Sequence, residues 1–166
     1  MKHFRQGPSE CFPTALGCYL ERPPREIIHE ILNPEFCFST WLDCAREPYG
    51  SPNLSLFRYK IKGFLDKHIS WLSPTAYMNE HFSVMVNWPR SLLDEENPSR
   101  GFITYQLLRR SSFSGMIMPI ARHIIAIEGN TVYDSNFIAP ILYEDYLPRV
   151  VGYTLIDGIY LEPKGV

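Results

Sequence analysis

The sequence predicts an α+β protein in which helices come first and pack on a mostly antiparallel sheet formed by the C-terminal half. Apolar residues recur at helical spacing up to about residue 68. The later part of the chain instead contains runs of β-branched and aromatic residues separated by turn signals. We expect residues 1–166 to form a single domain, because the chain contains neither an internal repeat nor a linker-like segment.

Four helices are expected in the first half, and proline or hydroxyl-bearing residues mark their starts. Pro13 fits the first turn of the first helix, where a proline removes no intrahelical hydrogen bond. Pro24 can start the second helix, Asn33-Pro34 can end it, and Ser39 is the candidate N-cap of the third. The predicted helices cover residues 11–21, 24–32, 39–46 and 54–68.

Two turn signals in the second half predict β-hairpins. Glu128-Gly129-Asn130 separates the apolar segments 122–127 and 131–134. Asp157-Gly158 separates two further segments of strand composition in the same way. The remaining strands are expected at residues 81–88 and 102–108, the second hairpin at 150–156 with 159–162, and a loop at 92–100.

Charge and hydropathy argue against several classes of partner. A formal net charge of -2 gives no electrostatic reason to bind nucleic acid or an anionic membrane, and Arg109-Arg110 is too short to form a basic patch. No apolar run reaches the roughly 20 residues of a membrane-spanning helix. The segment 1–6 lacks the apolar region of a secretory signal, so we expect a cytoplasmic protein without nucleic-acid or membrane partners.

The cysteine spacing does not favour a zinc site. Cys11 and Cys18 are seven residues apart, as are Cys37 and Cys44, whereas zinc knuckles use spacings of about two to four residues. A domain of this size in a reducing compartment does not need disulfides either. We therefore expect no metal or other cofactor, with three cysteines buried as small apolar residues and Cys11 chemically distinct.

Cys11 stands where a polar loop, residues 6–10, enters an apolar helix. A helix N-terminus and a nearby imidazolium both favour the thiolate, which is the nucleophilic form of cysteine. The amide of Gln6 and the backbone N–H of Cys11 are candidate donors to an oxyanion. The alternative is that Cys11 is simply a buried residue of an apolar helix.

His123 is the candidate base. A two-residue turn at Gly129-Asn130 sets a strand register in which His123, Asp134 and Asn136 share one face of the hairpin. A carboxylate beside an imidazole fixes its tautomer and stabilises its charged form, so Asp134 is the preferred orienter and Asn136 the alternative. A buried strand-end histidine without catalytic function is the competing interpretation.

Two motifs carry a resemblance to a known family. They are Gln-x4-Cys-x2-Thr-Ala-Leu at the start of the first helix and His-Ile-Ile-Ala-Ile-x-Gly-x-x-Val-x-Asp late in the chain. Together they resemble the papain-like cysteine peptidase superfamily, nearest to the bacteriocin-processing (double-glycine leader) peptidases and their stand-alone bacterial and phage relatives. The resemblance covers residues 6–32 and 122–136.

The resemblance implies a papain-like fold and a thiol peptidase acting on a protein or peptide. By position, Cys11 would be the nucleophile, His123 the base, Asp134 the orienter and Gln6 the oxyanion donor. Many members have Gly directly after the nucleophile, where this chain has Phe12.

The same triad would also serve an acyltransferase or a deamidase, because the centre does not specify the acceptor of the acyl group. An alternative from another class is a non-catalytic, papain-like factor of a phage or bacterium that binds a protein. Aromatic residues would suit such an interface, among them Trp41, Trp71 and Trp88.

Overall fold

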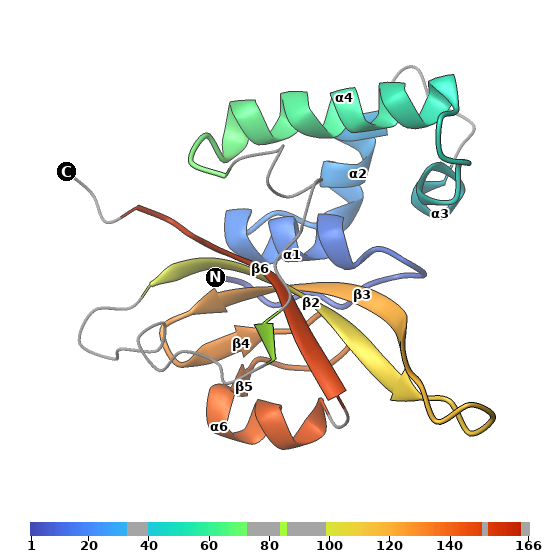
Figure 1. Ribbon diagram of the computed structural model, residues 1–166. Helices are drawn as coiled ribbons and strands as arrows, with labels where there is room; N and C mark the ends of the chain where they lie inside the picture. Colours follow the sequence, from blue (N-terminus) through green and yellow to red (C-terminus); the bar gives the residue numbers. More distant parts are fainter. Residues whose placement is uncertain (33–39, 73–83, 86–98, 151–152, 164–166) are drawn as a thin grey trace.

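The computed structural model describes residues 1–32, 40–72, 84–85, 99–150 and 153–163. Its helices come mainly from the first part of the chain and its sheet from the second, which confirms the α+β class (Figure 1). The helices of the first part are α1 Cys11–Leu20, α2 Pro24–Leu32, α3 Trp41–Ala45 and α4 Pro52–His68. Among the described helices, none combines the length and apolar character that crossing a bilayer requires.

Two of these helices begin at hydroxyl caps that differ from the predicted starts. Thr40 is the N-cap of α3, where its side chain accepts the Asp43 N–H at 3.1 Å. The predicted cap Ser39 is therefore wrong, and Ser39 itself lies outside the described residues. Ser51 caps α4 by accepting the Asn53 N–H at 3.1 Å, so α4 begins at Pro52 instead of residue 54.

The described strands form one sheet in the order β1-β6-β2-β3-β4-β5, and every neighbouring pair is antiparallel. Of the strand expected at 81–88, the structure describes only β1, and the loop expected at 92–100 lies outside the described residues up to 98. The strands are β1 Val84–Met85, β2 Arg100–Arg110, β3 Ile117–Glu128, β4 Thr131–Tyr133, β5 Ile141–Leu142 and β6 Tyr153–Leu161.

The β3–β4 hairpin has the predicted register. Glu128 pairs with Thr131, and Gly129 in the turn has a φ of 56°, a conformation that glycine adopts readily. The ladder ends where Ala126 pairs with Tyr133. Asp134 is consequently the first residue after β4. The chain leaves the sheet at this point, beside the middle part of the neighbouring strand β3.

The second predicted hairpin is wrong, because β6 runs straight through Asp157-Gly158. Gly158 pairs with Thr104 and Ile156 pairs with Tyr105, so the residues on both sides of Asp157 pair with β2. The register shifts at this point, which makes Asp157 the extra residue of a β-bulge. An Asp-Gly pair is compatible with a bulge as well as with a turn, and the long partner strand β2 decides between them.

Helix α1 lies between the sheet and α2, and α4 crosses beyond α2 (Figure 1). In α1, all residues from Phe12 to Tyr19 are buried, as expected for a helix that is apolar on all sides. The core around α1 includes Phe102, Ile124 and Ala126 from the side of the sheet that faces the helix. The opposite side of the sheet packs against the short helix α6 Tyr143–Tyr146. A single 3-10 turn, η2 Leu147–Arg149, follows α6.

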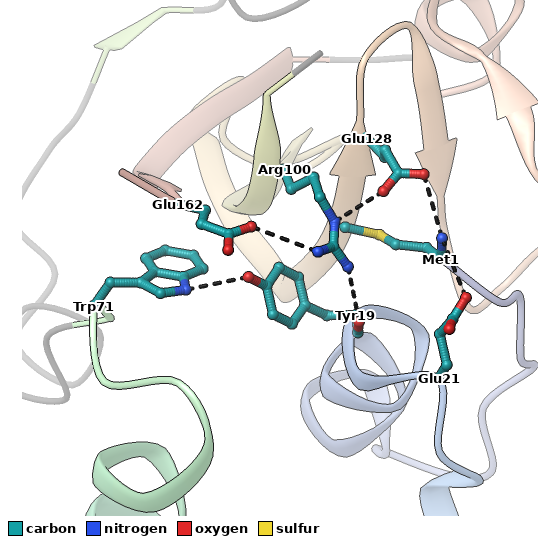
Figure 2. Close-up of polar contacts among 7 residues, drawn as sticks. All are labelled: Met1, Tyr19, Glu21, Trp71, Arg100, Glu128 and Glu162. Carbon is teal, nitrogen blue, oxygen red and sulfur yellow. Dashed lines mark hydrogen bonds and ion pairs between the residues drawn. The ribbon is translucent and has the colours of Figure 1, made fainter. Parts of the chain in front are cut away.

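The C-terminal end of α1 is tied to the sheet by Arg100 of β2 (Figure 2). Its guanidinium donates to the Tyr19 backbone carbonyl at 3.2 Å and stacks over the Tyr19 ring at 4.6 Å from the centroid. It also pairs with Glu128 at 2.8 Å and with Glu162 at 3.6 Å, at the ends of β3 and β6. Trp71 donates to the Tyr19 hydroxyl at 3.2 Å. These contacts fix the axial position of α1 and hence the place of its first residue.

We expect Gly101→Ala to destabilise the protein by about 2 kcal/mol or more, because overpacking between backbones is not relieved by side-chain rotation. A Cβ at Gly101 would lie 2.8 Å from the Leu161 Cα and closer still to the Tyr160 backbone. The free energy of unfolding from denaturant titration measures the effect.

Gly63→Ala is the matched control, since a Cβ there meets nothing within 4 Å in the middle of α4. This change should raise stability by about 1 kcal/mol through helix propensity. Equal stabilities of Gly101→Ala and the unmodified chain would contradict the close β2–β6 contact.

Candidate active site

The structure brings Cys11, His123 and Asp134 together from three separate elements. Cys11 is the first residue of α1, His123 lies in β3, and Asp134 follows β4. Cys11 and His123 line the same cavity, whose volume is about 290 Å³. The thiol and the imidazole, more than a hundred residues apart in sequence, thus share one opening to the surface.

His123 and Asp134 form a buried pair. The ring nitrogen Nε2 lies 2.7 Å from Asp134 Oδ1, and the two residues are 6% and 2% exposed. Because Nε2 is occupied by the carboxylate, Nδ1 is the ring nitrogen that remains to exchange a proton with Cys11.

The electrostatics of the pair favour the charged imidazole. Burial lowers the pKa of His123, but its hydrogen bonds with Asp134 and Cys11, together with the charges of those groups, outweigh burial and raise the pKa to about 9. Burial raises the pKa of Asp134, while the hydrogen bond and charge of His123 outweigh it and lower that pKa. Cys11 is thus one of the groups that raise the His123 pKa, and the two residues line the same cavity.

Both oxygens of the Asp134 carboxylate are held by donors. Oδ1 also accepts the backbone N–H of Asn136 at 2.9 Å, and Oδ2 accepts the hydroxyl of Tyr146 at 2.7 Å. Asn136 is exposed and contacts the carboxylate through its backbone, so Asp134, and not the Asn136 side chain, is hydrogen-bonded to the imidazole. The carboxylate cannot rotate without breaking one of these bonds.

Two buried tyrosines complete this arrangement, and sequence reasoning missed both. The Tyr146 hydroxyl lies 2.8 Å from that of Tyr105, whose ring meets His123 edge-on at a centroid distance of 5.4 Å. Tyr105 pairs directly with His123 across the β2–β3 ladder. Tyr105 could have been predicted from this pairing if the β2–β3 register had been known. No sequence feature of β2 or β3 fixes that register.

Gln6 lies beside the segment that carries Asp134. Its backbone N–H donates to the Ser135 carbonyl at 3.0 Å, and its side-chain Oε1 accepts the Ser135 hydroxyl at 2.6 Å. Since the oxygen end of the amide is occupied, the NH₂ end is the one available to donate. Ser135, which is 2% exposed, is a further residue that sequence reasoning missed. Within the described residues, Gln6 is not part of the cavity lining.

The cavity beside Cys11 is mainly apolar, with two basic residues in its lining. The apolar side chains come from α1, α3, α4 and β3, and the basic ones are Arg58 of α4 and Arg122 of β3. The described lining residues other than Cys11 and His123 are Phe12, Trp41, Ala45, Leu54, Phe57, Arg58, Ile61, Thr104, Arg122 and Ile124.

The other described cysteines, Cys18 and Cys44, differ from Cys11 in exposure. Cys18 is fully buried, and burial raises its pKa to about 11. Cys44 is also buried, and Cys37 lies outside the described residues. Cys11, Cys18 and Cys44 are all free thiols, and in the described part of the chain no three His, Cys, Asp or Glu side chains are grouped to hold a metal ion.

Comparisons with known proteins add no assignment. No family model, no curated protein and no solved structure matches the chain.

The raised pKa of His123 predicts a pH-dependent contribution to stability. A base whose pKa is raised on folding stabilises the protein below its unfolded value, here 6.5, and loses that contribution as the pH rises through about 9. We therefore expect the unmodified chain to be more stable than His123→Gln at pH 6, and this difference to shrink by pH 10. Urea titration at both pH values measures it.

His29→Gln is the control, because His29 is exposed on α2. Its effect on stability should be small at both pH values. A His123→Gln difference that stays constant from pH 6 to pH 10 would contradict the buried ion pair.

Proposed function

We propose that this chain is a papain-like thiol hydrolase that cleaves a peptide or another amide bond through Cys11, His123 and Asp134. The observation that carries the proposal is that Cys11 lines one cavity with a buried imidazole whose Nε2 is held by a carboxylate at 2.7 Å. A nucleophile, a base and an orienting group in this sequence of contacts are the requirements for covalent acyl transfer.

The reaction would proceed in two halves. His123 Nδ1 takes the thiol proton, and the thiolate attacks the substrate carbonyl to form a C–S bond. The resulting imidazolium donates its proton to the leaving nitrogen as the C–N bond breaks, which leaves a thioester on Cys11. A water molecule, deprotonated by His123, then attacks the thioester, releases the acid and regenerates the thiol.

Two donors are proposed for the oxyanion of each tetrahedral intermediate. The first is the amide NH₂ of Gln6, whose orientation is set by Ser135. The second is the Cys11 backbone N–H, which belongs to the first turn of α1, where N–H groups have no intrahelical acceptor.

The cavity suggests the kind of substrate. Its aromatic and aliphatic lining next to the thiol suits a bulky apolar group of the acyl portion, and Arg58 and Arg122 would favour a neighbouring acidic group. A protein or peptide would supply both groups. Transfer to an amine or hydrolysis of a glutamine side chain would use the same centre and the same residues.

Selective alkylation tests the proposed nucleophile. At neutral pH, iodoacetamide should label Cys11 at least about a hundredfold faster than Cys18 or Cys44, because only Cys11 combines exposure with an adjacent imidazolium. His123→Ala should slow Cys11 labelling at least about tenfold. Peptide mapping by mass spectrometry after timed quenching measures each rate.

Cys18→Ala is the matched control on the same helix and should leave the Cys11 rate unchanged. A peptide mixture incubated with the purified chain and with Cys11→Ala then tests cleavage, which only the unmodified chain should show. Sluggish labelling of Cys11 that is insensitive to His123→Ala would instead favour the non-catalytic binding protein.

A further inference from the structure

The hairpin tip formed by residues 109–118, where β2 turns into β3, projects beyond the rest of the sheet and away from the helices (Figure 1). The last described pair between β2 and β6 is Leu108 with Tyr153. Beyond it, Arg109 pairs with Met118 and Arg110 with Ile117, so within the described residues the tip is a two-stranded ribbon.

This hairpin tip exposes a cluster of large apolar side chains. Phe113 at the apex is fully exposed, and the three residues that follow the turn are about half exposed. The fractions are 102% for Phe113, 63% for Met116, 43% for Ile117 and 51% for Met118. Several large apolar side chains exposed at a projecting apex are typical of a surface that is covered by a partner.

Hydrogen bonds within the turn hold the apex in a defined shape. The Ser111 hydroxyl accepts the N–H groups of Phe113 at 3.2 Å and Ser114 at 3.4 Å, and the Ser111 N–H donates to the Met116 carbonyl at 2.7 Å. Arg110 donates to the Gly115 carbonyl at 3.3 Å. The turn therefore exposes Phe113 to solvent in its existing conformation, and no change of the turn is needed for a partner to reach this side chain.

The charge near the hairpin tip is opposite to the charge of the whole chain. Arg109 and Arg110 are consecutive in the strand, so they flank the ribbon on its two faces, just behind the apolar apex. Residues 99–127 contain no Asp or Glu, although the chain as a whole has a formal charge of -2. The sequence-based expectation of no membrane partner used the net charge and the shortness of the Arg109-Arg110 pair, and did not include the exposed apolar side chains beside that pair.

We propose that the hairpin tip docks on the surface of an anionic phospholipid bilayer. Phe113 and Met116 would enter the boundary between the lipid headgroups and the acyl chains. Arg109 and Arg110, at the end of β2 next to the turn, would meet the lipid phosphates. An apolar apex with a cationic collar matches the layering of an anionic bilayer surface. This inference does not depend on the proposed hydrolase, although β3 carries both the tip and His123.

Vesicle sedimentation tests the docking directly. The purified full chain should bind vesicles of phosphatidylcholine containing phosphatidylglycerol and bind vesicles of phosphatidylcholine alone much more weakly. Added salt should weaken the binding, because it screens the arginines. Phe113→Ser should lower the partition coefficient by about tenfold, and Arg109→Gln should lower it and reduce its salt dependence.

Tyr59→Ser is the matched control, because Tyr59 is an exposed aromatic residue on α4, 70% accessible, and its loss should not change binding. The proposal fails if neither type of vesicle binds the chain, if both bind equally, or if Phe113→Ser binds as well as the unmodified chain. Self-association that Phe113→Ser abolishes, without vesicle binding, would identify the tip as a protein interface and also overturn the proposal.

Discussion

The burial of α1 on both sides is the constraint on which the candidate site depends. The helix packs on β3 with one side and on α2 with the other, and Arg100 ties its last turn to three strand ends. A helix held in this way cannot slide along its axis without losing core packing. Its first residue, Cys11, is therefore held at a fixed place beside His123 although no covalent or secondary-structure link joins the two.

The His123–Asp134 pair depends in turn on a set of buried polar contacts. Removing two charged groups from water is unfavourable unless hydrogen bonds satisfy them. Here the Asp134 carboxylate accepts hydrogen bonds from the His123 ring, the Tyr146 hydroxyl and the Asn136 backbone N–H. The Tyr146 hydroxyl is also hydrogen-bonded to that of Tyr105. Through Tyr105 and Tyr146, the pair is thus linked to the core on the side of the sheet that packs against α6.

The sequence could predict the local parts of this arrangement. Hydrophobic periodicity gave the helices, and Gly129-Asn130 gave the β3–β4 register that brings Asp134 near His123. The contacts of Ser135, Tyr105 and Tyr146 could not be predicted, because they join segments whose alignment is set only by tertiary packing. Asp157-Gly158 failed as a hairpin signal for the same reason, since the length of β2 overrode the local turn preference.

The direct test of the thiol–imidazole coupling is an NMR titration of His123 in the unmodified chain and in Cys11→Ala. The account predicts a His123 pKa of about 9 in the unmodified chain and a lower value once the sulfur is removed, because Cys11 contributes to the upward shift through its hydrogen bond and its charge. A His123 pKa that is the same in both proteins, or that stays near 6.5, would contradict it.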